Sequence, residues 1–135
     1  MPLSSRSNYL ALLIAAPQSG EIAMLRDQAA MVDGLLARGL LADQILCLHG
    51  RLDRSLVTAF LHAASRRVAP WTGGSVFLHV SGHGFIQGES AENARPGLLF
   101  TENEDYADDG HLLWEDFFAA QPLPVGVDLT LLPDL

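Results

Sequence analysis

The chain contains a single cysteine, Cys47, among its 135 residues. A disulfide within the chain is therefore excluded, and no group of cysteine and histidine residues has the spacing of a structural zinc site. Small secreted domains commonly depend on disulfides, so the near absence of cysteine favours a reducing compartment. We expect a cytoplasmic protein that needs no metal and no other cofactor.

Basic residues are also scarce. Lysine and arginine together number 8 against 16 acidic residues, which gives a formal net charge of −8. Surfaces that bind phosphate groups need the opposite sign, so this charge argues against nucleic acid and against an anionic membrane as partners. Apolar residues make up 49% of the chain. This fraction suffices for a buried core, and we expect one domain over residues 1–135.

Long hydrophobic runs are absent. The longest, residues 9–17, is far shorter than the roughly 20 residues that a membrane-spanning helix needs. The run follows Arg6 and contains Ala15 and Ala16, as a secretory signal peptide can. Only one charge precedes it, however, and its cleavage would remove a core strand. We therefore interpret it as a strand of the mature protein.

Strands and helices are predicted to alternate along the chain. Four strands are predicted at residues 9–16, 44–48, 75–81 and 127–132; the first is a continuous apolar run, and the third is rich in β-branched and aromatic residues. Residues 85–109 are predicted to be a loop, with a minor strand at 98–100. A strand and helix alternation of this kind predicts a parallel sheet with right-handed crossovers.

Three helices are predicted between these strands from apolar residues spaced three and four apart. The first ends at Gly39, the second is capped by Asp53, and the third covers residues 111–120. Their core faces are predicted to be Ile22, Leu25, Ala29, Val32 and Leu36 in the first, Leu56, Phe60, Ala64 and Val68 in the second, and Leu113, Phe117 and Ala120 in the third. In the second helix, Arg54, Thr58, His62 and Arg66 are predicted to face water.

The residues Ser81-Gly82-His83-Gly84 follow the third predicted strand directly. Ligands of parallel sheets bind where strands end, and glycines on both sides of a histidine allow a sharp turn there. An imidazole in this place suits proton transfer near neutral pH, and the amide of Gly84 could donate to an oxyanion. The alternative is a glycine turn whose histidine has no chemical role.

An apolar strand followed by this motif resembles the sequence around the catalytic histidine of the caspase and metacaspase family. The resemblance extends over most of the chain: residues 10–15 are similar to the first strand of that family, and residues 26–40 to its first helix. Residues 98–100 and 109–118 resemble the segment before the nucleophile strand. The resemblance implies a three-layer α/β/α caspase-like fold, with a mainly parallel sheet of about four strands in the order 2-1-3-4.

The resemblance also implies a cysteine endopeptidase that uses a cysteine and histidine dyad. His83 and Gly84 would be catalytic, and Ser81, Gly82 and Asp134 would bind a protein or peptide substrate. In that family the nucleophile stands two residues after the acid or amide at the end of the fourth strand, here Asp134. The position lies one residue beyond Leu135.

Cys47 is not expected to replace that nucleophile. It lies in the second predicted strand, where we expect a buried thiol with a raised pKa. The family's strand order would also separate it from His83 by a whole strand.

The sequence leaves several functions open. The chain could be the large-subunit-like half of a peptidase whose cysteine lies elsewhere, or a non-catalytic caspase-like binding module. A flavodoxin-like binding domain with phosphate at residues 82–84 is a third alternative.

A metal site formed by His79, His83 and His111 fits poorly, because the glycine turn breaks any regular geometry. The acidic residues 102–109 are predicted to be a solvated loop. The strand at 127–132 is predicted to have an open edge that pairs with a second copy or a complementary chain.

Overall fold

A computed structural model describes residues 8–16, 22–88, 90–100 and 110–134 of the chain. The regular elements alternate between strand and helix in the first half and include a group of short strands in the second. In chain order they are β1 (Tyr9–Ala15), α1 (Ile22–Ala37), the 3-10 turn η1 (Ala42–Gln44), β2 (Ile45–His49), α2 (Arg54–Val68), β3 (Gly74–Ser81), β4 (His83–Gln87), β5 (Arg95–Leu99), β6 (His111–Leu113), α3 (Trp114–Ala119) and β7 (Val127–Asp134).

Four of these strands form a parallel sheet in the order β2-β1-β3-β7. This confirms the predicted fold class, since β7 is the fourth strand of the predicted order 2-1-3-4. Every residue from Leu10 to Ala15 is 0% exposed, because β1 has a strand on each edge and helices over both faces. The unbroken apolar run of β1 follows from that burial.

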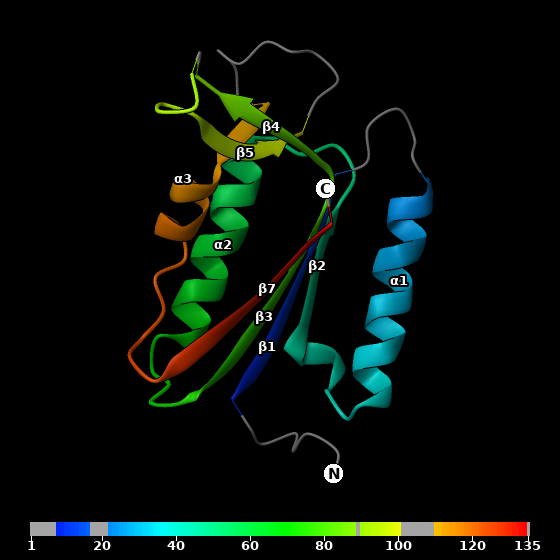
Figure 1. Ribbon diagram of the computed structural model, residues 1–135. Helices are drawn as coiled ribbons and strands as arrows, with labels where there is room; N and C mark the ends of the chain where they lie inside the picture. Colours follow the sequence, from blue (N-terminus) through cyan, green and yellow to red (C-terminus); the bar gives the residue numbers. More distant parts are fainter. Residues whose placement is uncertain (1–7, 17–21, 89, 101–109, 135) are drawn as a thin grey trace.

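The helices form the outer layers on the two faces of this sheet. Figure 1 shows α1 on one face and α2 with α3 on the other, so the molecule has three layers. Every second residue of β1 and β3 points toward α2. These residues form the main hydrophobic core together with the buried residues of α2. Within the described residues, no helix is both long and apolar enough to cross a membrane.

The predicted ends of two helices are confirmed. Gly39 follows α1 with a φ of 104°, a left-handed conformation that favours glycine. The side chain of Asp53 accepts a hydrogen bond from the Leu56 amide at 2.7 Å and caps α2.

The predicted core faces of α1 and α2 were partly wrong. Ile22 is 60% exposed, and Ala29, Leu36 and Leu56 also face solvent. Phe60 is only half-buried. Val57 and Leu61 are buried beside the correctly predicted Ala64 and Val68. Helix orientation is set by which residues meet the sheet, and several apolar stripes were compatible with the same spacing.

A polar residue, Gln28, is the buried residue of α1. Its side-chain amide donates to the carbonyl oxygen of Leu13 at 3.1 Å and to that of Leu48 at 3.3 Å. These bonds link α1 to β1 and β2 and satisfy the amide group that burial would otherwise leave costly.

The prediction of a loop over residues 85–109 was wrong where β4 and β5 lie, whereas the minor strand predicted at 98–100 overlaps β5. Strands β4, β5 and β6 form a second, antiparallel sheet in that order, called the small sheet below. It includes His111–Leu113, which were predicted as the first turn of a helix; α3 begins only at Trp114. The predicted inward face of α3 is confirmed, because Leu113, Phe117 and Ala120 are buried. The acidic residues 102–109 lie outside the described part of the chain.

Candidate functional site

The carboxyl ends of three parallel strands meet at Ser81. Ser81 pairs with Ala15 of β1 on one side and with Asp134 of β7 on the other. The Ala16 amide donates to the Ser81 carbonyl oxygen at 2.8 Å, and the Gly82 amide donates to the Asp134 carbonyl oxygen at 3.1 Å. The predicted site residues Ser81 and Gly82 are therefore neighbours of Asp134 at one edge of the sheet, although they are far from it in the sequence.

His83 opens β4 after a connection of one residue, Gly82. The side chain of Ser81 is 2% exposed and Gly82 is buried, whereas His83 is half-buried and Gly84 is exposed. Asp134 is exposed as well. The motif thus presents an imidazole and a glycine backbone to solvent, with a carboxylate-bearing residue on the adjoining strand end. Such a surface can transfer a proton and attract a cationic group.

Gly82 has a packing reason to be glycine. A β-carbon at this position would lie 3.0 Å from Leu98 Cδ1 and 3.5 Å from the β-carbon of Ala16. Leu98 is fully buried, so its methyl group has little room to move. Glycine at position 82 is therefore favoured by the close contact between the small sheet and the residue that follows β1.

Cys47 was predicted to be buried, and this prediction was wrong. Its residue is exposed, since β2 is the outermost strand of the sheet on its side. The thiol is partly covered, and this desolvation raises the pKa of Cys47. Strand β1 separates β2 from β3, which puts Cys47 about 10 Å from β3 across the sheet. The thiol is therefore poorly placed for His83, as predicted.

The other histidines do not assemble a metal site. Among the residues that the structure describes, no group of three or more histidine, cysteine, aspartate or glutamate side chains could hold a metal ion. His79 is 4% exposed and points away from the α2 side of the sheet. It lines a hollow of about 440 Å³ with residues of α1 and with Asp134.

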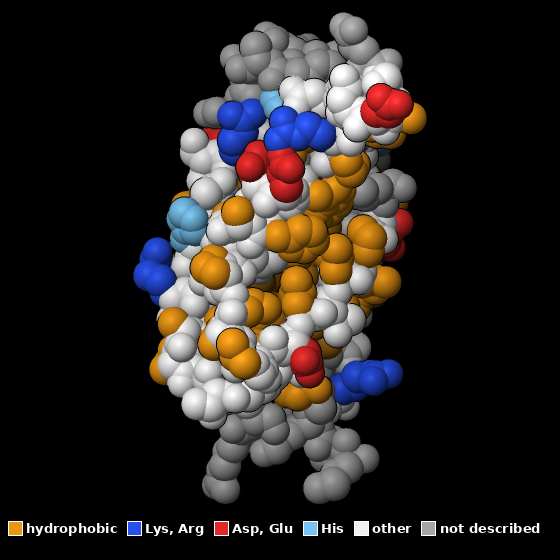
Figure 2. Space-filling model, turned by 60° about the vertical axis from the view of Figure 1, so that its left-hand side comes forward, with side chains coloured by type: hydrophobic (Ala, Val, Ile, Leu, Met, Phe, Trp, Pro, Cys, Tyr) orange, Lys and Arg blue, Asp and Glu red, His pale blue; other side chains and the backbone are white. Residues whose placement is uncertain are grey.

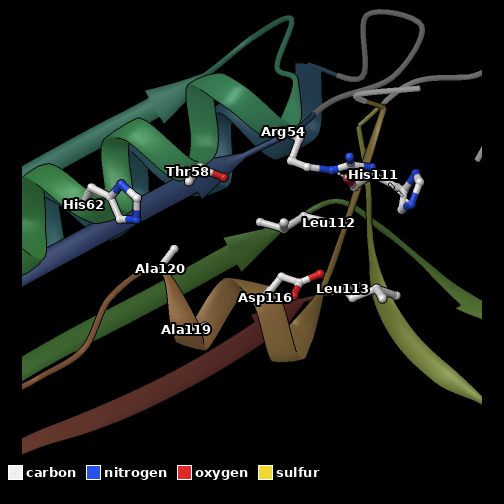
Figure 3. Close-up of a pocket in the computed structure, with 9 residues that line it drawn as sticks. All are labelled: Arg54, Thr58, His62, His111, Leu112, Leu113, Asp116, Ala119 and Ala120. Atoms are coloured by element: carbon white, nitrogen blue, oxygen red, sulfur yellow. Dashed lines mark hydrogen bonds between the residues drawn. The ribbon is translucent and has the colours of Figure 1, made fainter. Parts of the chain in front are cut away.

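A polar contact between α2 and the small sheet was not predicted from the sequence. Arg54 was predicted to face water, but it is half-buried. Its Nε donates to the His111 carbonyl oxygen at 3.0 Å, and an Nη lies 3.3 Å from His111 Nε2. The two residues sit at one end of a hollow of about 410 Å³ between α2 and α3, shown in Figure 3, with His62 at the other end and Asp116 on α3. No short-range pattern signals this contact, because 57 positions separate Arg54 from His111.

The Arg54 contact assigns the protonation of His111. A guanidinium group can only donate hydrogen bonds, so Nε2 of His111 must accept and the ring proton must lie on Nδ1. Burial, and secondly the positive charge of Arg54, lower the pKa of His111. A neutral imidazole is thus the form that fits this site.

Stability is expected to fall on acidification because of His111. Unfolded His111 takes up a proton near pH 6.5, whereas folded His111 does so only at lower pH. Between these two values the unfolded chain binds more protons. The stabilisation is therefore complete above about pH 6.5 and is lost as the pH falls through the folded-state pKa. Urea unfolding followed from neutral to acidic pH measures this loss.

The matched variants are His111→Gln and His62→Gln. Glutamine at 111 keeps an acceptor for Arg54 but does not titrate, so it should reduce the pH dependence. His62→Gln removes an exposed histidine from the same hollow. An undiminished pH dependence in His111→Gln would contradict the assignment.

Comparisons with protein-family models and with curated proteins found no match for this chain. The function is therefore argued from the geometry of Ser81–Gly84 and Asp134.

Proposed function

We propose that this chain is the histidine-bearing half of a caspase-like cysteine endopeptidase domain. The observation that carries the proposal is the pairing of Asp134 with Ser81, together with the bond from the Gly82 amide to the Asp134 carbonyl oxygen. This pairing directs the end of β7 toward the turn that bears His83. A residue two positions after Asp134, where the family has its cysteine, would continue along that edge of the sheet.

The proposed reaction is hydrolysis of a peptide bond in two stages. The cysteine thiolate attacks the carbonyl carbon and forms a carbon–sulfur bond, and the amide of Gly84 donates to the oxyanion. His83 then gives a proton to the departing amine as the carbon–nitrogen bond breaks. In the second stage His83 removes a proton from water, which attacks the acyl group and releases the cysteine.

Asp134 is proposed to favour a basic residue in the substrate. Its residue is exposed at the strand end beside Ser81, and a carboxylate there would attract a lysine or arginine side chain. Ser81 and Gly82 would contribute through the path of the backbone, because Ser81 is buried and Gly82 has no side chain. Because a nucleophilic thiol must stay reduced, we place the protein in the cytoplasm, which cell fractionation can check.

The coding sequence past Leu135 tests the proposal directly. A cysteine codon in frame at position 136 is expected, and a protein that includes it should cleave peptides after lysine or arginine. A stop codon there would sink the proposal and would favour the alternative of a non-catalytic caspase-like binding module.

Cys47 is expected to behave as an ordinary exposed thiol in the 135-residue chain. It should react with a small alkylating reagent but not with a peptidyl electrophile designed for catalytic cysteines, because it lies a full strand away from β3. Mass spectrometry of the treated chain measures both reactions. Peptidyl labelling of Cys47 that disappears in His83→Ala would show that the nucleophile has been misassigned.

Pairing through β7 is proposed for the assembly. Within the described residues, β7 is hydrogen-bonded to β3 on one edge only. Figure 2 shows a band of hydrophobic side chains on the side of the molecule that carries α3 and β7. The partly buried Val127, Leu129 and Leu131 of β7 pack against the core on that side, and Val125 is 97% exposed. An open strand edge beside apolar side chains favours association.

Light scattering at high protein concentration should therefore detect a dimer of this chain. A monodisperse monomer of the parent chain would contradict pairing with a second copy.

A further inference from the structure

The small sheet places His111 in the same cross-strand row as His83. His83 pairs with Leu99, and Leu99 pairs with His111. Residues directly opposite each other in antiparallel strands project to the same face. His83 and His111 are therefore on one face of the small sheet, about 10 Å apart across two strand spacings.

The small sheet is held to the parallel sheet by core packing of Leu98 and Leu112 and by two chain connections. At the His83 end the connection is the single residue Gly82, whose backbone is tied to Asp134. At the far end, β6 runs directly into α3. The row of His83, Leu99 and His111 lies on the opposite face of the small sheet from Leu98 and Leu112, so its position also depends on what holds the His111 end.

Arg54 holds that end. Its guanidinium group contacts the carbonyl oxygen of His111 at 3.0 Å and the imidazole of the same residue at 3.3 Å. One side chain on the first turn of α2 thus fixes both the backbone and the ring of a residue on β6. His111 is 5% exposed, so this contact is largely shielded from water, which strengthens it.

From this geometry we propose that Arg54 and His111 are positioning residues for His83. The contact between α2 and β6 fixes the small sheet, and the sheet's hydrogen-bond ladder transmits that position to β4. The role in catalysis rests on the proposed peptidase function, whereas the effect on the position of His83 does not. A misplacement of about 1 Å can lower a rate about 100-fold, so a contact remote from the reacting atoms can matter.

Hydrogen exchange in the full chain tests the mechanical part of the proposal. In Arg54→Gln, amides of β4 and β6 should exchange at least about tenfold faster, while amides of β1 keep their parent rates. Arg66→Gln is the matched control, because it removes an exposed arginine from the same helix. Equal acceleration in β1 and in the small sheet, or no acceleration in the small sheet, would overturn the proposal.

A second measurement separates positioning from charge and from loss of folding. Arg54→Lys keeps the positive charge but cannot contact the carbonyl and the ring in the same forked geometry. The ring resonances of His83 should shift in Arg54→Lys and stay unchanged in Arg66→Lys. His83 resonances identical to the parent in Arg54→Lys would overturn the proposal, even if Arg54→Gln failed to fold.

Activity supplies the third measurement in the protein that includes the proposed cysteine. Arg54→Lys should lower kcat by about tenfold or more with little change in KM, because substrate contacts remain. An unchanged kcat in an active protein would overturn the positioning role. If the parent protein has no peptidase activity, the proposed function fails, while the exchange rates and the His83 resonances still decide whether Arg54 positions that ring.

Discussion

Replacing His83 with alanine is expected to lower kcat/KM of the proposed peptidase by about 10²- to 10⁴-fold, the range that general acid–base catalysis supplies. The expectation applies to the protein that includes a cysteine at position 136. His83 would both protonate the departing amine and activate water, so its loss affects both stages of the reaction. Initial rates with a peptide that contains a single lysine or arginine measure the effect.

His62→Ala is the control for this variant. His62 is exposed on α2, outside the Ser81–Gly84 motif. Circular dichroism should show that both variants keep the fold, since His83 is only half-buried. Equal activity of His83→Ala and His62→Ala would exclude His83 as the acid–base residue.

Phe117→Ala is expected to destabilise the fold by about 3–5 kcal/mol, the usual loss when a buried aromatic residue becomes alanine. The Phe117 side chain is 0% exposed and belongs to the main hydrophobic core. Its ring also packs edge-on against Trp114, with ring centroids 5.3 Å apart. A loss of this size is a large part of the stability of a typical domain, about 5–15 kcal/mol. Urea unfolding with an unchanged slope measures it.

The next residue provides a matched control. Phe118 is 40% exposed and stacks on the same Trp114 with centroids 6.1 Å apart. Phe118→Ala removes the same atoms from an exposed position. It should lower the free energy of unfolding by about 1 kcal/mol, the usual contribution of one aromatic pair. Similar losses in the two variants would show that α3 does not bury Phe117 as described.

The parallel sheet could be predicted from the sequence because its strands carry strong local signals. The run in β1 is short, apolar at every position and followed by Pro17 and Gly20, as is typical of a strand covered on both faces. The right-handed crossover rule then restricts how such strands are ordered. The pairing of Asp134 with Ser81 follows from the same order, so the approach of these two residues was predictable as well.

The small sheet could not be predicted in the same way. Its strand β5 reads Arg-Pro-Gly-Leu-Leu, and β4 contains Gly84. Proline and glycine are typical of loops, and their presence in strands depends on pairing with neighbours that a local pattern does not contain. The same limit applies to Arg54, whose contact with His111 exists only because β6 lies beside the start of α2.

The close packing at Gly82 separates two kinds of evolutionary constraint within one motif. A β-carbon at position 82 would press tightly on Leu98 whether or not the protein is a catalyst, whereas His83 is needed only if a proton is transferred. Among homologues that have lost catalysis, we expect glycine to persist at 82 while position 83 drifts to other residues. In active homologues both should be invariant. An alignment in which 83 is retained and 82 varies freely would contradict this reading of the motif.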